Sequence, residues 1–590
     1  MCGIIGFNWK NKKLIERKTN NLKHRGPDNQ SIFISKNISI GHSRLAIIDL
    51  DKRSNQPLIN ENKKLIITFN GEIYNFKEIK TELEKKGHKF KTTSDTEVLL
   101  KGFEEWSEKL VDKLDGMFAF CIVNTDKKEL FLARDHFGLK PLYYFSKKDK
   151  FAFSSELREL IEFTDKKISK EGLEEYFNYR FTKGKNTLIK NIHKVLPGEF
   201  LKVKYETGKI TKTKYYSLKL KQNKLNKKET KKKIKELVTK AIKKRLIADV
   251  QIGSFLSGGL DSTIVTTIAK KINPKLNTFS MGFETTNELE YAKIVSKKIK
   301  SKHKEFNYTQ KKLFNQIETI IKHMDEPIGD AGFVPIYALS KEASKYNKVV
   351  LCGDGSDEIF CGYDRYKLYH YSKLINWIPF NMGKDILIKI QKTKNKKGFK
   401  KFFEITRLLD KNELKKIKIK DKAIKFENEN KNLNEIMKYD IETLLPNDFF
   451  MKTDKMAGSS GLEIRTPFMD KELVEFVMSI KPQWKLRFWN EKKILKETFK
   501  KIIPKEITKR RKQGFNVPID YWFKNKLNKE LKTLLNRNNH QLYSKEEIYK
   551  LLDKIKTINE NKYKENFIIA QKLWAVYVFE KWYEMYIKEK

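Results

Sequence analysis

The chain has 590 residues, 39% of them hydrophobic and 12% aromatic, and carries a formal net charge of +49. At about 150 residues per domain this length predicts two to four folded domains, and the apolar content excludes a chain that is disordered throughout. The lysines are spread from end to end and do not concentrate in one segment, so the charge does not favour a nucleic-acid partner.

Cysteine content and hydropathy set the expected compartment. There are four cysteines, Cys2, Cys121, Cys352 and Cys361, and none has the short paired spacing of a structural zinc site. The N-terminal residues lack the apolar length of a signal peptide, and no apolar run approaches the roughly 18 residues of a membrane span. We therefore expect a protein of the reducing cytoplasm with no membrane partner.

The first part of the chain, up to about Lys204, is dominated by short β-rich runs such as MFAFCIV and ELFLARD, separated by polar or glycine turns. Two amphipathic helical stretches interrupt these runs, at Phe76–Lys86 and Thr96–Trp106. Many strands with few helices predict a sheet-rich α+β domain.

The pattern changes after a lysine-rich segment. Apolar strands now alternate with helices, which begin near Ser262 and Leu289, and this alternation predicts a doubly wound parallel α/β sheet. Beyond about Asn376 the chain is expected to be mostly helical. The predicted divisions are a first domain at 2–205, a basic linker at 206–235, a second domain at 236–525 and a helical C-terminal extension at 526–590.

Cys2 follows the initiator methionine, so removal of Met1 would place a thiol and a free α-amine on one residue. The amine can then serve as the base for its own side chain near neutral pH. A cysteine at this position is usually accidental, so the case for catalysis depends on the motifs further along the chain.

Five short motifs occur in order: Cys2–Gly6, His24–Asp28, Arg44–Asp49, Asn70–Asn75 and Ser94–Glu97. At these residues the sequence resembles the class II glutamine amidotransferase domain of the N-terminal nucleophile hydrolases, which implies an α+β sandwich. Singly, each motif has an ordinary structural reading: Arg44 in an ion pair, Asn70 and Gly71 in a hairpin turn, Asp95 at a helix N-terminus. Together and in this order, they favour the resemblance.

The resemblance assigns roles within this domain. It makes Cys2 the nucleophile, and the Asn70 amide and Gly71 N–H the donors to the oxyanion. Arg44 and Asp95 would hold the carboxylate and ammonium of glutamine. The full implied glutamine-binding set is Arg44, Leu45, Ala46, Ile47, Ile48, Asn70, Gly71, Glu72 and Asp95.

A second motif, Ser257–Ser262 (SGGLDS), stands between a predicted strand and a predicted helix. Glycines there let the backbone approach phosphate, and a helix N-terminus offers free N–H groups, although such turns often contain glycine for geometry alone. The motif resembles the pyrophosphate loop of ATP pyrophosphatases. The implied ATP-binding set is Leu256, Ser257, Gly258, Gly259, Asp261, Ser262, Met281, Cys352 and Gly353.

The segment Cys352–Glu358 (CGDGSDE) brings three carboxylates to the same predicted sheet edge. Polyphosphate chemistry uses Mg²⁺, which prefers one or two carboxylates together with phosphate oxygens. The resemblance makes Asp261 and Asp357 the metal-linked acids and Asp354 a proton acceptor. Without it, the segment would be read as a polar turn that caps a helix.

Further on, Lys509–Pro518 resembles the C-terminal basic motif of the asparagine synthetase family, with Lys512 at the position that stabilises departing pyrophosphate. Asp325–Pro327 and Leu462–Phe468 also match, so the resemblance extends from residue 2 to about 520. The chain departs from the family at Asp354, where some members have glutamate, and at Cys361, where glycine is common.

These readings predict a glutamine-dependent, ATP-driven ligase that amidates aspartate through a β-aspartyl-adenylate and releases AMP, pyrophosphate and glutamate. Its small-molecule substrates would be glutamine, aspartate and ATP, its metal Mg²⁺, and its assembly a homodimer. Two alternatives stay open: an amidotransferase that acts on another carboxylate, such as a sugar uronic acid or a peptide side chain, and a nucleic-acid-binding protein on a borrowed fold.

Overall fold

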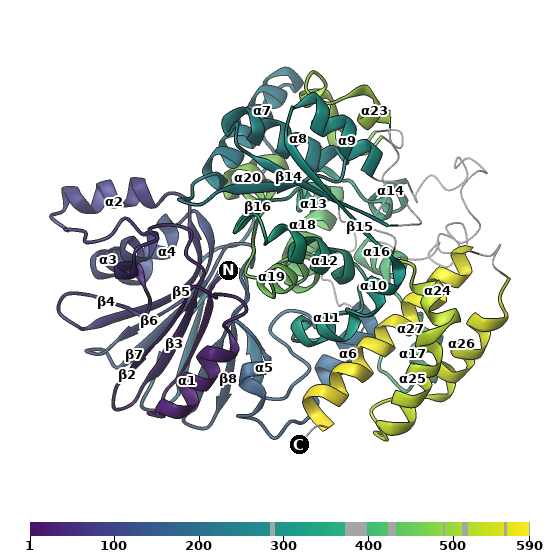
Figure 1. Ribbon diagram of the computed structural model, residues 1–590, viewed down its shortest axis with the longest axis horizontal. Coiled ribbons are helices and arrows are strands. Elements are labelled where there is room, and N and C mark those ends of the chain that lie inside the picture. The colour runs from purple at the N-terminus through teal and green to yellow at the C-terminus, as the bar shows by residue number, and fades with distance from the viewer. Residues whose placement is uncertain are drawn as a thin grey trace.

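The computed structural model describes residues 1–283, 289–371, 398–422, 432–487, 490–509, 517–559 and 563–588 (Figure 1). None of the helices in these ranges combines the length and apolar character needed to cross a lipid bilayer.

Two six-stranded antiparallel sheets form the N-terminal part of the molecule. The first has the order β10-β8-β9-β1-β3-β2, and the second the order β12-β11-β7-β6-β5-β4. Their strands are β1 (Gly3–Phe7), β2 (Asn29–Ile34), β3 (Ser39–Arg44), β4 (Leu58–Ile59), β5 (Leu65–Ile73), β6 (Gly116–Asn124), β7 (Glu129–Arg134), β8 (Tyr143–Lys147), β9 (Lys150–Ser154), β10 (Ile192–Lys194), β11 (Glu199–Lys204) and β12 (Lys209–Lys214).

The two sheets pack face to face around one apolar layer. Ile4 and Ile40 from the first sheet meet Ala119, Cys121 and Leu132 from the second, all of them fully buried. This layer forms because successive side chains of a strand point to opposite faces, so alternate residues of each sheet face the other sheet. The α+β sandwich expected from the sequence is therefore present.

Helices cover the outer faces of this sandwich. They are α1 (Lys12–Asn21), α2 (Phe76–Lys85), α3 (Asp95–Trp106), α4 (Leu110–Lys113), α5 (Arg158–Ile161) and α6 (Lys170–Tyr179). The Ser94 side chain accepts from the Glu97 N–H and so fixes the start of α3. The two helices predicted in this part, at Phe76–Lys86 and Thr96–Trp106, are thus confirmed as α2 and α3 within one residue.

A five-stranded parallel sheet with the order β15-β14-β13-β16-β17 forms the core of the second part. Its strands are β13 (Ile252–Phe255), β14 (Asn277–Phe283), β15 (Lys302–Tyr308), β16 (Val349–Leu351) and β17 (Glu463–Arg465). Helices α7 (Lys227–Arg245), α8 (Leu260–Ile272), α9 (Leu289–Lys298) and α12 (Phe333–Ala343) pack around it. The predicted doubly wound parallel sheet is confirmed, and the lysine-rich segment expected as a linker holds β12 and the start of α7.

The remaining part is helical. Its helices are α10 (Gln310–Phe314), α11 (Ile317–Met324), α13 (Ser356–Phe360), α14 (Asp364–Tyr371), α16 (Gly398–Thr406), α17 (Lys411–Lys416), α18 (Leu433–Leu444), the π-helix η4 (Leu445–Phe449), α19 (Phe450–Gly458), α20 (Lys471–Met478), α21 (Pro482–Lys485), α22 (Lys493–Phe499), α23 (Lys505–Lys509), α24 (Ile519–Lys524), α25 (Lys526–Arg537), α26 (Glu546–Thr557) and α27 (Tyr563–Tyr583). The last four pack together at one side of the molecule (Figure 1, yellow-green to yellow).

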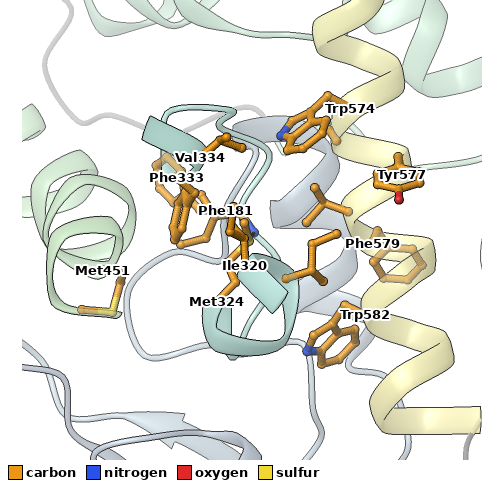
Figure 2. Close-up of a cluster of buried hydrophobic side chains, with 14 of the residues drawn as sticks. Phe181, Ile320, Met324, Phe333, Val334, Met451, Trp574, Tyr577, Phe579 and Trp582 are labelled. Atoms are coloured by element: carbon orange, nitrogen blue, oxygen red, sulfur yellow. Dashed lines mark hydrogen bonds between the residues drawn. The ribbon is translucent and has the colours of Figure 1, made fainter. Parts of the chain in front are cut away.

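The long helix α27 runs back from this bundle toward the N-terminal part. Figure 2 shows its side chains Trp574 and Trp582 facing Ile320, Met324 and other apolar groups. Tyr176 of α6 donates to the Ala575 carbonyl oxygen at 2.7 Å, and Trp582 Nε1 donates to the Asp325 carbonyl oxygen at 2.9 Å. The C-terminal helix therefore joins the two parts of the molecule.

Candidate active site

Cys2 lies directly before β1, half-buried in a small pocket at the end of the sandwich. Its Sγ accepts from the Leu45 N–H at 3.5 Å. Burial raises the pKa of the thiol above its ordinary value, while the neighbouring N-terminal amine and the Leu45 N–H act in the opposite direction. Burial also lowers the pKa of the Met1 amine to about 5.

The sequence-predicted glutamine-binding residues come together around this thiol. Arg44, Leu45, Ile47, Ile48, Gly71, Glu72 and Asp95 line the pocket, with Ser94 and Thr96 of the same motif as Asp95. Ser54, Gln56 and Phe69, which the sequence did not single out, also line it. Ala46 contributes differently, because its N–H donates to Asp28 Oδ2 at 2.7 Å and fixes the loop after β3.

Asn70 is fully buried on β5, beside the pocket residues Phe69 and Gly71. Within the described ranges, neither its Nδ2 nor its Oδ1 has a hydrogen-bond partner. An unpaired buried amide costs about 1 to 3 kcal/mol, so a ligand is the natural partner. A Cβ on Gly71 would lie 2.1 Å from the Met117 carbonyl oxygen, so only glycine fits there.

Hydrogen bonds hold both Arg44, the last residue of β3, and Asp95, the first residue of α3. The Arg44 guanidinium donates to the carbonyl oxygen of Asp51 and to Asn55 Oδ1, both at 2.8 Å, and also to the Asp49 carbonyl oxygen. Asp95 Oδ2 accepts from the Ile73 N–H at 3.0 Å. Burial raises the pKa of Asp95 to about 6.

Arg465 of β17 connects this pocket to the parallel sheet. Its guanidinium contacts Glu72 Oε1 at 3.0 Å and Glu463 Oε1 at 2.8 Å, and it is fully buried. The Leu462–Phe468 motif contains Arg465, but the sequence gives no sign of the contact with Glu72, because the two residues lie in distant parts of the chain.

A second cavity lies at the carboxyl ends of β13, β14 and β16. Of the sequence-predicted ATP residues, Leu256, Ser257, Gly259, Asp261, Ser262, Met281, Cys352 and Gly353 line it, together with Asp354, Asp357, Thr453 and apolar neighbours. Parallel sheets bind ligands at this edge.

The turn between β13 and α8 has the geometry expected of a phosphate loop. Gly258 has φ +65°, and a Cβ there would meet the backbone of Tyr291 and Ala292 at about 2.6 Å. Ser257 Oγ and Ser262 Oγ are 3.1 Å apart. Gly259, which precedes α8 as its N-cap, has no side chain to cap the helix. The first N–H groups of α8 are therefore available to an anion.

Lys492 lies between the two acids that the sequence assigned to the metal. Its Nζ is 2.5 Å from Asp261 Oδ2 and 2.7 Å from Asp357 Oδ1, and these carboxylates raise its pKa above the ordinary value despite burial. Sequence reasoning missed Lys492 because nothing distinguishes it among so many lysines. Lys512, the predicted pyrophosphate residue, falls outside the described residues.

Asp354, the predicted proton acceptor, is at the same edge. Burial raises its pKa, and the Lys452 ammonium acts in the opposite direction. Asp354 is thus a partly desolvated carboxylate next to a cation, which suits a group that must accept a proton.

The two sites approach each other through α19. Arg25 Nε donates to the Cys2 carbonyl oxygen at 2.9 Å, and Arg25 Nη2 donates to Asp454 Oδ1 of α19 at 2.8 Å. Thr453, the preceding residue of α19, lines the second cavity. Figure 1 shows the chain's N-terminus close to α19, in agreement with these contacts.

A thiol pocket on an antiparallel sandwich and a glycine-rich loop on a parallel sheet are the two halves of a glutamine-dependent ligase. Comparison with protein families agrees with each half: the glutamine amidotransferase domain family matches residues 1–216, and the asparagine synthase family matches residues 233–584. The chain belongs to the asparagine synthase family.

Similar proteins span almost the whole chain. Glutamine-hydrolysing asparagine synthetase 1 of Bacillus subtilis (strain 168) is 32% identical, covering 100% of this chain and 98% of its own. Asparagine synthetase 3 of the same organism is 28% identical over 94% of this chain and 93% of its own. Asparagine synthetase 2 of Oryza sativa subsp. japonica is 30% identical over 88% of this chain and 78% of its own.

Proposed function

We propose that this enzyme converts aspartate to asparagine with glutamine as nitrogen donor and ATP as energy source, through a β-aspartyl-adenylate. AMP, pyrophosphate and glutamate would be the co-products. One observation carries the proposal: a buried Asn70 amide, without a hydrogen-bond partner among the described residues, lies beside a thiol pocket. Helix α19 connects this pocket to a cavity whose lining includes the glycine-rich loop.

Glutamine hydrolysis would take place at Cys2. The thiol sulfur attacks the side-chain amide carbon of glutamine, and the Asn70 and Gly71 N–H groups stabilise the oxyanion. The C–N bond then breaks, ammonia leaves with a proton, and water hydrolyses the thioester to glutamate. Removal of Met1 would give Cys2 the free amine that takes and returns the proton.

Amide formation would take place in the second cavity. An oxygen of the aspartate side-chain carboxylate attacks the α-phosphorus of ATP, and pyrophosphate leaves. Ammonia attacks the acyl carbon, AMP leaves, and Asp354 accepts the surplus proton. Lys492 pairs with Asp261 and Asp357 in the structure. When ATP binds and displaces Lys492 from these acids, its ammonium would hold the pyrophosphate.

The acids that pair with Lys492 fit a magnesium ion. Asp261 and Asp357 both contact the same ammonium, so their oxygens lie close together, and two carboxylates plus phosphate oxygens are a donor set that Mg²⁺ prefers. The ion would neutralise the polyphosphate charge. Among the described residues no group of three or more His, Cys, Asp or Glu side chains forms a metal site, so the remaining ligands would come from ATP and water.

A product assay by mass spectrometry with glutamine, aspartate, ATP and magnesium tests the proposal. We expect asparagine with AMP and pyrophosphate, and Cys2→Ala should keep this activity with ammonium but lose it with glutamine. Glutamate production without asparagine would overturn aspartate as the acceptor and direct the search to other carboxylates, such as sugar uronic acids.

A further inference from the structure

Gln56 lines the pocket around Cys2, and the reaction steps above do not use it. It follows the short 3-10 helix η1 (Lys52–Ser54) and is 5% exposed. Its Oε1 accepts from the Phe69 N–H at 2.7 Å, and its Nε2 donates to Thr96 Oγ1 at 3.0 Å. The amide of Gln56 therefore uses its acceptor on β5 and its donor on α3.

Both partners of Gln56 stand next to residues with candidate roles in the pocket. Phe69 directly precedes Asn70 on β5, and Thr96 directly follows Asp95 at the start of α3. A hydrogen bond to either partner therefore fixes the backbone that carries its neighbour. One buried amide spans the distance between the candidate oxyanion donor and the candidate ammonium-binding acid.

A second contact joins the same two elements. The Ile73 N–H donates to Asp95 Oδ2 at 3.0 Å, so β5 and α3 are connected on both sides of the Asn70 position. A single contact between two elements would leave them free to rotate about it, whereas two contacts fix their orientation as well. Gln56 supplies the contact on the Phe69 side.

The segment that carries Gln56 also holds the remaining charged group of the pocket. The Arg44 guanidinium donates to the Asp49 carbonyl oxygen and to Asn55 Oδ1, as described above. Asp49 Oδ2 accepts from the Thr93 N–H at 2.7 Å and from Thr93 Oγ1 at 3.1 Å, just before α3. One short segment therefore holds the Arg44, Asp95 and Asn70 ends of the pocket in a common frame.

We propose that Gln56 is a positioning residue for glutamine hydrolysis. Its amide sets the distance between Asn70 and Asp95, so that a glutamine bound through its ammonium presents its amide oxygen to Asn70. An amide suits this task because it carries an acceptor and a donor on one planar group. This inference rests on the proposed function and adds a residue to its first half-reaction.

The kinetic signature follows from what each end of the pocket binds. The oxyanion exists only near the transition state, so a displaced Asn70 lowers kcat. The ammonium of glutamine is bound before and during the reaction, so a displaced Asp95 raises KM. Gln56→Met removes both hydrogen bonds, and we expect kcat to fall and KM to rise by about tenfold each, the scale of a small misplacement.

Thr96→Val separates the two ends, because it removes the hydroxyl on the Asp95 side and leaves the Phe69 bond intact. We expect a higher KM for glutamine with a smaller change in kcat than in Gln56→Met. Thr96→Ser keeps the hydroxyl and should recover most of the loss. Glutamate release measured over a range of glutamine concentrations gives both constants.

Asn60→Leu is the matched control, because Asn60 is an equally buried amide that also joins β5 to α3. Its Oδ1 accepts from the Leu65 N–H at 2.9 Å, and its Nδ2 donates to Glu104 Oε1 at 2.6 Å. None of these three residues lines the pocket. We expect this variant to lower Tm and to leave kcat and KM for glutamine unchanged.

Asparagine formation with ammonium, which would take place in the second cavity, reports that each variant is folded. Equal kinetic changes in Gln56→Met and Asn60→Leu would reduce Gln56 to a general structural role and overturn the inference. A wild-type KM in Thr96→Val would also overturn it, while the proposed function would stand. If the wild-type enzyme releases no glutamate from glutamine, the proposed function and this inference fail together.

Discussion

Burial controls the ionisation of the candidate catalytic side chains. It raises the pKa values of Cys2, Asp95 and Asp354, because a desolvated thiolate or carboxylate is less stable than its neutral form. Each of these groups lies near a positive charge or an N–H donor that acts in the opposite direction. Of the three, Asp95 has its pKa raised to about 6, so its charge changes just below neutral pH.

Asp95 should give glutaminase activity an acidic limb. We propose that the ionised Asp95 carboxylate attracts the ammonium of glutamine, and with a pKa of about 6 it loses its charge as the pH falls through that value. We expect kcat/KM for glutamine to fall about tenfold per pH unit below 6, which a pH profile of glutamate release measures. In Asp95→Asn the activity should be low at all pH values and this limb absent. An unchanged limb in the variant would assign it to another group.

Lys492 should be essential to the ATP-dependent half of the reaction. Lys492→Met removes the cation that holds Asp261 and Asp357 together and, in our proposal, the one that receives pyrophosphate. We expect the rate of asparagine formation with ammonium to fall at least about 100-fold, the scale of a lost electrostatic contact in an active site, with glutaminase activity retained.

Lys496→Met is the matched control for that change. Lys496 lies on α22 one turn beyond Lys492 and contacts Glu491 at 3.7 Å. Its replacement should leave synthesis within about twofold of wild type, as expected for a weak and partly exposed pair. Equal rates for the two variants would remove Lys492 from the mechanism.

At the scale of secondary-structure elements, α27 is the element that secures the second part of the molecule against the first. Its Trp574 and Trp582 are almost fully buried against α11 and neighbouring segments (Figure 2). Trp582 also donates to the Asp325 carbonyl oxygen, while the Asp325 carboxylate accepts from the Leu157 and Arg158 N–H groups. A helix near the C-terminus thereby supports the segment that follows α11.

Trp582→Ala should therefore be strongly destabilising. Loss of a buried aromatic side chain costs about 3 to 5 kcal/mol, and the unpaired Asp325 carbonyl oxygen adds to that cost. We expect a lower Tm in a thermal unfolding scan, whereas Tyr521→Ala, at a position 55% exposed, should leave Tm close to wild type. Similar Tm values for the two variants would show that α27 packs less tightly than described.

At the scale of the whole molecule, buried ion pairs join the glutaminase pocket to the parallel sheet. Arg465 bridges Glu72 and Glu463, and its Nη1 donates to the carbonyl oxygens of Arg245 and Ile247 at 3.1 and 2.6 Å. Such groups are tolerated inside a protein only when every charge is paired. A residue of the second part thus fixes a wall of the first site.

Arg465→Met should consequently impair glutamine use more than ammonium use. It leaves Glu72 without its guanidinium partner, while Glu463 keeps Lys140 at 3.8 Å, so Glu72 loses its charge or its position in the candidate glutamine pocket. We expect the KM for glutamine to rise at least tenfold in a glutaminase assay, with ammonium-dependent synthesis less affected. Lys348→Met breaks an exposed pair with Asp28, at 2.7 Å, between the same two parts, and should change neither. A wild-type KM in Arg465→Met would refute this link.

The local features of the molecule follow from its amino-acid sequence alone. Strand and helix periodicities predicted both architectures. The family resemblance of short motifs indicated Cys2, Asn70, Asp95 and the loop at Ser257–Ser262, whose glycines let the backbone approach phosphate. The roles of these residues and the predicted domain boundaries stay predictions.

Contacts between residues far apart in the chain, by contrast, come from the way the whole chain folds. Lys492 against Asp261, Lys452 against Asp330 and Arg465 against Glu72 are pairs formed across long separations by the order of the sheet strands and the packing of α19. In a chain with 124 lysines and arginines, composition cannot single out the few cations that are buried. Burial is what distinguishes them, because a charge removed from water must find its partner inside the fold.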